Sequence, residues 1–258
     1  MKNVLEFLKS HVSVRQFSGR EISAEDEMTI VATAQRSPTS SNLQAYTIVG
    51  IRSQATKDKL AQLCGDQAHV ARSSLFLVFC ADLYRLQRIN SAKGYPFQGD
   101  YTELGLVATV DTSLAASRAL MAAQAMGMGG VMVGSIRNHP TEVTKLLDLP
   151  HLTFAVMGMS LGYPSVVPPI KPRLPIEGIY CREKYSDEIF DRAIAEYDLE
   201  IDKGGHLKGR EVQKGLYPNF TGNYTWSEHS ARRVADTSPL TLRAHMKPYL
   251  NSQGLFVK

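Results

Sequence analysis

The 258-residue sequence lacks the features that mark secreted and membrane proteins. No uncharged run reaches the ~20 residues of a membrane span, and charged residues interrupt the apolar stretch at the N-terminus, so we expect neither a span nor a signal peptide. The three cysteines are odd in number, far apart and without zinc-ligand spacing; they are Cys64, Cys80 and Cys181. We therefore expect a cytoplasmic protein with reduced, buried thiols and no membrane partner.

A clustered basic segment is also missing. The net charge is +4, but lysines and arginines are scattered, and the dense pair is Arg232 and Arg233. Binding to a nucleic-acid duplex usually leaves a clustered basic footprint, so nucleic acid is not an expected partner. A small positive surplus suits an anionic small molecule instead.

Familiar catalytic motifs are absent as well. The sequence has no GxSxG, HExxH or P-loop motif, and no two histidines lie four residues apart. Gly127, Gly129 and Gly134 approach the dinucleotide-binding pattern GxGxxG. Met132 replaces its third glycine, however, and the segment follows a helix and precedes a strand, the reverse of the order that binds pyrophosphate. An enzyme of this sequence would depend on a cofactor.

Apolar patterns predict both helices and a sheet. Ser23 and Asp26 resemble a capping box, so a helix should begin after Ser23 and end before Pro38. Further helices are expected near the N-terminus, between the first two strands, and at Glu103–Met126 and Thr141–Leu147. Strands are expected at Ala45–Ile51, Leu75–Cys80, Val131–Ser135 and Thr153–Leu161. This order indicates an α+β or α/β sandwich around a mixed sheet.

Two further stretches bear on the organisation of the chain. The expected helix Glu103–Met126 is apolar nearly all round, which is typical of a helix buried centrally or at a dimer interface. After Gly162, closely spaced prolines predict a stiff, extended segment, and the remaining chain has too few apolar residues for a core of its own. We therefore assign residues 1–165 to a core and residues 166–258 to a C-terminal arm of the same domain.

Three separated segments carry side chains suited to a ligand. The first contains His11, Ser13 and Arg15. The second is Ser37–Gln44, and the third is Lys171–Pro175, in which prolines hold two cations two residues apart. Each segment alone is also consistent with an exposed loop, a polar turn or a charged linker. Together they supply cations, hydroxyls and amides for a phosphate, a polyol and an electron-poor ring, a combination that fits flavin mononucleotide (FMN).

Seven short motifs follow one another in order along about the first two-thirds of the chain. They are Ser13–Phe17, Ser40–Gln44, Phe79–Asp82, Gly129–Val131, Ile136–Asn138, Val143–Leu147 and Lys171–Pro175. In this series the sequence resembles the nitroreductase superfamily, specifically its NADPH-dependent flavin reductase and oxygen-insensitive nitroreductase branch. The resemblance implies an α+β sandwich with a mixed, mainly antiparallel sheet flanked by helices. It also implies an obligate homodimer, with FMN sites built by both chains.

The resemblance further implies which residues bind the cofactor. They are His11, Val12, Ser13, Arg15, Thr39, Ser40, Gln67, His69, Met132, Val133, Gly134, Ser135, Lys171 and Arg173. Within this set the phosphate would be held by His11, Ser13, Lys171 and Arg173. Arg15 would face the pyrimidine edge of the flavin. Gln67 and His69 would contact the ribityl chain and its surroundings. A strand ending at Gly134 and Ser135 would run beneath the ring, with backbone N–H groups near flavin N5.

By the same resemblance, Thr39 and Ser40 come from the other subunit, and Ser41 and Asn42 contact the acceptor. The implied reaction is ping-pong: NADPH or NADH reduces the flavin, and a nitroaromatic, a quinone or free flavin then reoxidises it. No side chain is expected to act as an obligatory nucleophile, and no metal is expected. Arg15 and the backbone at Gly134 would instead tune the flavin.

Several departures leave details of this interpretation open. Val12 stands where many relatives have arginine, and Asn42 replaces an aromatic residue near the acceptor. The stretch Lys203–Asn223, which includes Lys208 and Arg210, leaves the choice between NADPH and NADH open. The alternatives are a flavin-binding module without turnover, a specialised FMN enzyme such as a dehalogenase, and a protein without flavin that binds an acidic partner.

Overall fold

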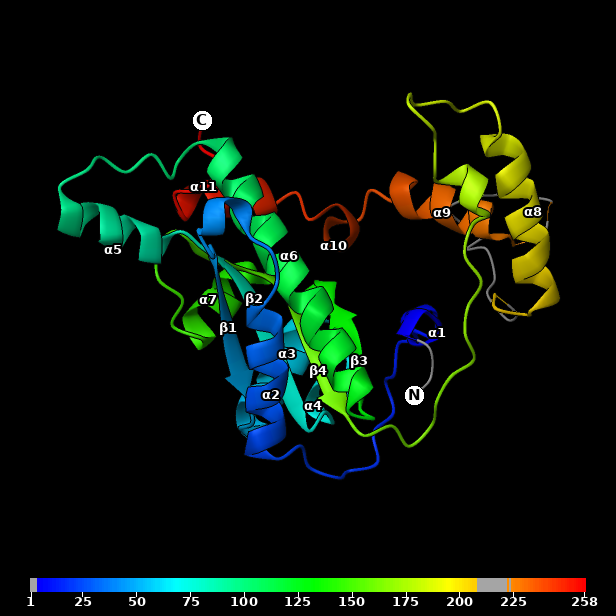
Figure 1. Cartoon of the computed structure of the whole chain (residues 1–258), viewed down its shortest axis with the longest axis horizontal. Helices are drawn as coiled ribbons and strands as arrows, with labels where there is room; N and C mark the ends of the chain where they lie inside the picture. The colour runs from blue at the N-terminus through cyan, green and yellow to red at the C-terminus, as the bar shows by residue number, and fades with distance from the viewer. Residues whose placement is uncertain (1–3, 208–221, 223) are drawn as a thin grey trace. The chain divides into compact units, whose positions relative to one another are not determined.

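The computed structural model describes residues 4–207, 222 and 224–258 (Figure 1). The chain forms two compact units: the first comprises Met1–Pro168 with Arg243–Lys258, and the second comprises Pro169–Leu242. None of the helices among the described residues has the length and apolar composition needed to cross a membrane. The assignment of residues 166–258 to an arm of the same domain stays a prediction.

The first unit is built on a four-stranded antiparallel sheet in the order β1-β2-β4-β3. The strands are β1 (Tyr46–Ile51), β2 (Leu75–Asp82), β3 (Gly129–Val133) and β4 (Thr153–Gly162). Beside β3, Ser13 forms an isolated parallel bridge with Gly130. The expected α+β class with a mainly antiparallel sheet is confirmed.

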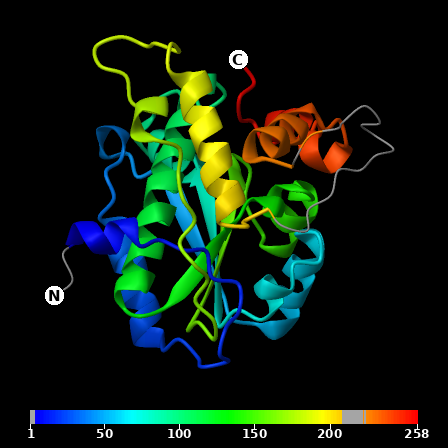
Figure 2. The same ribbon diagram turned by 90° about the vertical axis from the view of Figure 1, so that its right-hand side faces the viewer.

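Helices cover both faces of this sheet, as Figures 1 and 2 show. The helices of the first unit are α1 (Val4–Lys9), α2 (Ala24–Gln35), α3 (Gln54–Leu63), α4 (Ala68–Ala71), α5 (Tyr84–Lys93), α6 (Thr102–Ala125), α7 (Pro140–Leu146) and α11 (Met246–Ser252). It also has two 3₁₀ turns, η1 (Ser40–Asn42) and η2 (Gly134–Arg137). The second unit contains η3 (Ile176–Gly178), α8 (Phe190–Lys203), α9 (Trp226–Ala235) and α10 (Pro239–Leu242).

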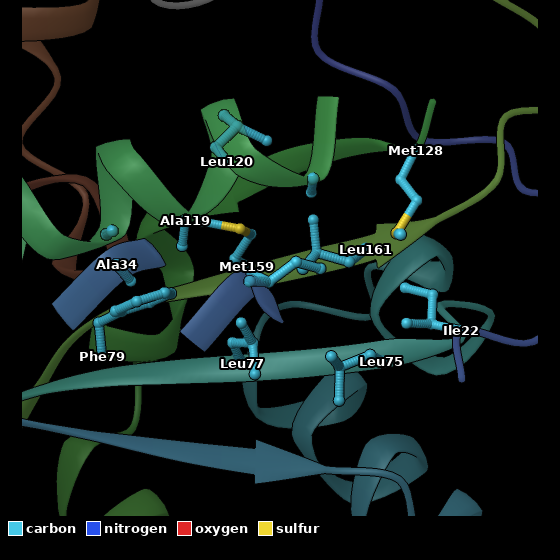
Figure 3. Close-up of a cluster of buried hydrophobic side chains, with 13 residues drawn as sticks. Ile22, Ala34, Leu75, Leu77, Phe79, Ala119, Leu120, Met128, Met159 and Leu161 are labelled. Carbon is cyan, nitrogen blue, oxygen red and sulfur yellow. The ribbon is translucent and has the colours of Figure 1, made fainter. Parts of the chain in front are cut away.

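Alternation along β2 explains the two layers. Leu75, Leu77 and Phe79 point toward α2 and α6, where they join a core of leucine, isoleucine, methionine and alanine side chains (Figure 3). Phe76 and Val78 point to the opposite face, into a second core with α3, α4 and α7. Successive side chains of a strand face opposite sides, so a strand that is apolar throughout must be covered on both faces.

Helix α6 is buried along one side only. Alanines such as Ala108, Ala115 and Ala119 are fully buried against the sheet and α2. On the other side Leu106 is 50% exposed and Val110 is 55% exposed. An exposed row of large apolar side chains is unusual for a helix of this composition and is typical of an interaction surface.

The structure corrects two details of the predicted strands and helices. The strand expected to reach Ser135 ends at Val133, and Gly134 begins the 3₁₀ turn η2. The last pair between β3 and β4 joins Val133 to Gly158. Beyond this pair, the Arg137 guanidinium donates to the backbone carbonyl of Val156 in β4. The helix expected at Glu103–Met126 spans Thr102–Ala125, and Gly127, with a φ of 80°, follows its end.

Candidate functional site

The N-terminal segment brings Ser13 and Arg15 to the outer edge of β3. The Val14 amide donates to the Gly130 carbonyl at 3.0 Å, and Val14 itself is buried. A Cβ atom at Gly129 would lie 2.5 Å from Cγ2 of Val14, so this close packing requires glycine. Because side chains alternate along an extended segment, Ser13 and Arg15 lie on the side away from Val14, toward solvent.

Helix α4 is joined to the same edge of the sheet by two side chains. The Gln67 Nε2 atom donates to the Ser135 hydroxyl at 3.0 Å. Nδ1 of His69 lies 3.0 Å from the hydroxyl of Ser160, a fully buried residue that pairs with Val131 of β3. These two contacts fix Gln67 and His69 above β3 and β4.

Arg15 lies close enough to His69 to influence its charge. Burial lowers the pKa of His69 below its usual value, and the positive charge of Arg15 lowers it further. Because folding lowers this pKa, the unfolded chain binds the proton more readily, and the contribution of His69 to stability is lost as pH falls below the ordinary imidazole pKa. Above that range His69 is neutral and adds no charge to the site.

The proximity of Arg15 to His69 predicts a change in proton binding. In the ligand-free protein, Arg15→Gln should raise the pKa of His69, measured by NMR titration of the imidazole protons, since a repulsive positive charge is removed. Arg36→Gln, which removes an exposed arginine that follows α2, should leave the pKa unchanged. An unaltered His69 titration in Arg15→Gln would show that the two groups are not neighbours.

Gly134 leaves open space at the junction of β3 and η2. Its φ is not positive, and an added Cβ would come no closer than 3.5 Å to neighbouring side chains, the nearest atom being Nη2 of Arg137. Packing within the chain therefore does not require glycine at this position. A missing side chain that the fold does not need is consistent with close approach of a ligand to the backbone.

The polar segment after α2 is held by one buried carboxylate. Asp111, in the middle of α6, is 1% exposed and accepts the backbone N–H of Ser40 at 3.0 Å and that of Ala45 at 3.2 Å. Between them Ser41 and Asn42 have φ values of 47° and 55°. Asp111 is absent from the residues predicted for the site, although an acidic residue inside an otherwise apolar helix was the signal that could have found it.

The strand register separates this segment from Arg15 within one chain. Tyr46, which follows the segment, pairs with Ala81 at one end of the sheet on its β1 edge. Ser13 pairs with Gly130 at the other end, on the β3 edge. With about 4.8 Å between strands and about 3.3 Å per residue, the two corners are roughly 20 Å or more apart. One copy of the chain does not bring Thr39–Asn42 to Arg15.

The segment instead borders a hollow of about 380 Å³ beside α6. Its lining combines polar groups of the segment with the exposed apolar side of the helix: Pro38, Thr39, Ser40, Glu103, Leu106, Val107, Val110, Asp111 and Leu114. Polar residues that were expected to reach a partner's site therefore lie next to apolar side chains of α6 that the described part of the chain leaves exposed.

Lys171 and Arg173 belong to the second unit, and both side chains are exposed. The hydroxyl of Tyr197 on α8 donates to the Pro172 carbonyl at 3.0 Å and so fixes the backbone between the two cations. Arg173 also donates to the carbonyls of Lys171 and Pro172. Lys203 is the last residue of α8 and His206 lies in the turn that follows, whereas Lys208 and Arg210 fall outside the described residues.

All three cysteines are free, and the two buried ones are unsuited to nucleophilic chemistry. Burial raises the pKa of Cys64 to about 11 and that of Cys80 to about 12, so both are protonated thiols near neutral pH. Cys181 is only partly buried, which corrects the expectation that all three are buried. Among the described residues, no group of three or more histidine, cysteine or acidic side chains is arranged to hold a metal ion.

Comparisons with known proteins agree along the whole chain. Residues 8–163 match the model of the nitroreductase family, and residues 171–258 match the model of its C-terminal domain. An NADPH-flavin oxidoreductase of Vibrio harveyi is 35% identical over 99% of both chains. An oxygen-insensitive NADPH nitroreductase of Salmonella typhimurium is 33% identical over 98% of both. The solved structure of NADPH:FMN oxidoreductase from Vibrio harveyi in complex with NAD+ superposes with a TM-score of 0.85, at 34% identity and full coverage of both chains.

Proposed function

The chain belongs to the nitroreductase family, and we propose that it is an FMN-dependent NAD(P)H oxidoreductase that reduces nitroaromatics, quinones or free flavin. The observation that carries the proposal is the meeting of Ser13, Arg15, Gln67 and His69 above the edge of β3, beside the open space at Gly134. Relatives whose names include NADPH and flavin or FMN support the same cofactor and donor.

The residues at this edge fit the phosphate of FMN. The side-chain amide nitrogen of Gln124 on α6 lies 3.1 Å from Nδ1 of His11. When the amide N–H donates to Nδ1, the ring proton of neutral His11 is on Nε2, where it can be donated to an anion. Ser13 adds a hydroxyl beside it, and we assign Lys171 and Arg173 the role of charged phosphate ligands.

The groups around the ring site fit the flavin itself. The Gln67 amide nitrogen is engaged by Ser135, which leaves the amide oxygen to accept a hydrogen bond from a ring N–H. Arg15, which has no carboxylate partner among the described residues, would stabilise negative charge on the reduced ring. Bound FMN would supply the hydride chemistry that none of these side chains can perform.

Dimerisation is part of the proposal. The exposed row on α6 offers an apolar contact surface, and the adjoining Thr39 and Ser40 would reach the site of a second copy, with Ser41 and Asn42 near the acceptor. The register of the sheet supports this arrangement, because these residues lie too far from Arg15 to complete its site within one chain. We also propose a cytoplasmic location, which the free cysteines support.

An absorption spectrum followed by anaerobic titration tests the function. We expect a yellow protein with one FMN per chain that is bleached by NADPH or NADH and recovers its colour when an acceptor is added. Comparing the bleaching rates for the two nicotinamides identifies the donor. Protein that is colourless and takes up no added FMN would contradict the proposal, and yellow protein that neither nicotinamide bleaches would favour a flavin-binding module without turnover.

A further inference from the structure

A second, basic hollow lies in the first unit, apart from the residues assigned to FMN. It has a volume of about 530 Å³, within the range of small-molecule sites. It lies between the loop that follows the N-terminal segment, the start of α3, and the chain that links α4 to β2. The lining residues that carry its chemistry are Arg20, Glu21, Arg52, Gln54, Lys57 and Arg72.

Positive charge dominates this lining, with four cations against the single carboxylate of Glu21. Of these cations, Arg52 forms an ion pair, in which its Nε atom lies 2.6 Å from Oε2 of Glu27. The Arg20 guanidinium lies 3.8 Å from the centre of the Tyr163 ring, a stacking that leaves its N–H edge available. Arg72 is exposed at the rim.

Lys57 is the distinctive member of the lining because it is charged and only 6% exposed. Its Nζ atom donates to the Ser73 carbonyl at 2.6 Å, and no carboxylate among the described residues lies within ion-pair distance of it. Burial lowers its pKa, Asp58 and Glu21 raise it, and Arg52 lowers it. A buried ammonium that no carboxylate contacts directly is costly, and an anion in the hollow would offset that cost.

The N-terminus of α3 adds a further attraction for an anion. This helix has ten residues and begins at Gln54, which lines the hollow. The Ser53 hydroxyl accepts the N–H of Thr56, and the Ser53 carbonyl accepts the N–H of Lys57. The N–H groups of Gln54 and Ala55, at the first two positions of the helix, have no acceptor within the helix. Helix N-termini bind phosphate through such amides and through the positive end of the helix dipole.

We propose that this hollow binds the phosphoryl group of a small phosphorylated molecule. Lys57 and the start of α3 hold the phosphoryl oxygens from below, and Arg20 and Arg72 close over them from the rim. The hollow is larger than a phosphate ion needs, so the remainder of the molecule has room beside Phe17. This site goes beyond the proposed oxidoreductase function and uses none of the residues assigned to the flavin.

Isothermal titration of the FMN-saturated protein with inorganic phosphate, pyrophosphate and AMP tests the site. We expect saturable binding at one site per chain without release of FMN, which is followed by its fluorescence. Lys57→Met should weaken binding about tenfold or more, the loss of one charge-assisted contact. Lys59→Met removes an exposed lysine two residues along the same helix and should bind as the parent does.

The titrations distinguish a phosphoryl site from nonspecific attraction of anions to a basic surface. AMP binding more tightly than phosphate would show that the rest of a phosphorylated molecule occupies the hollow. Absence of saturable binding for all three probes, displacement of FMN, or equal losses in Lys57→Met and Lys59→Met would each overturn the proposal. Arg72→Gln, at an exposed position, should also weaken binding and gives a second test should Lys57→Met fold poorly. FMN content is measured separately, so failure of the oxidoreductase proposal is distinguishable.

Discussion

Replacing Lys171 and Arg173 together by alanine is expected to release FMN, raising its Kd by about 100-fold or more. Charge-assisted hydrogen bonds to a phosphate contribute about 1.5–3 kcal/mol each, and this variant removes two such donors. Neither side chain is buried, and the backbone between them is held by Tyr197, so the substitutions should leave the second unit folded. Fluorescence of released FMN during dilution measures the change.

Arg182 and Lys184 provide a matched control for this prediction. They are an arginine and a lysine two residues apart, exposed, and in the same unit. Their double alanine variant removes the same charge and should retain FMN as the parent does. If both double variants lost FMN equally, a general electrostatic effect would account for the result. If the Lys171 and Arg173 variant kept its FMN, these residues would not be phosphate ligands.

The main elements of the fold could be predicted because their signals are local. The buried strand β2 is a continuous apolar run, and Ser23 caps α2 by accepting the Asp26 N–H at 3.0 Å, as its capping-box pattern indicated. Helices α4 and α5 were not predicted. The first has four residues, and the second has no buried residue, so neither shows apolar periodicity.

The candidate site was harder to predict because it depends on contacts between distant residues. Ser160 is one of two hydroxyl residues in the otherwise apolar strand β4, and only the packing of α4 shows that it meets His69. Gln67 and His69 were included in the predicted site because of the resemblance to the nitroreductase superfamily. Residue patterns alone did not point to them. That Thr39 lies at the opposite corner from Ser13 follows from strand register, which no local pattern encodes.

Introducing a charge on the exposed side of α6 is expected to separate the proposed dimer and, with it, to empty the flavin site. Val110 is 55% exposed in the single chain, beside Leu106 and Leu114. Glutamate at this position fits the fold of one chain, but in a dimer it would bury an unpaired carboxylate against an apolar surface, at a cost of several kcal/mol. Val110→Glu should therefore be a folded monomer by light scattering and should bind FMN about 100-fold or more weakly.

Val234→Glu is the matched control, because it makes the same replacement at a valine that is 80% exposed on α9. This variant should remain dimeric and keep its FMN. A Val110→Glu protein that is monomeric yet binds FMN normally would show that one chain completes the site, contrary to the separation of Thr39 and Arg15 by the sheet. A Val110→Glu protein that remains dimeric would place the interface elsewhere. Loss of both properties in Val110→Glu alone would tie flavin binding to the surface of α6, since folding within each chain does not require Val110 to be apolar.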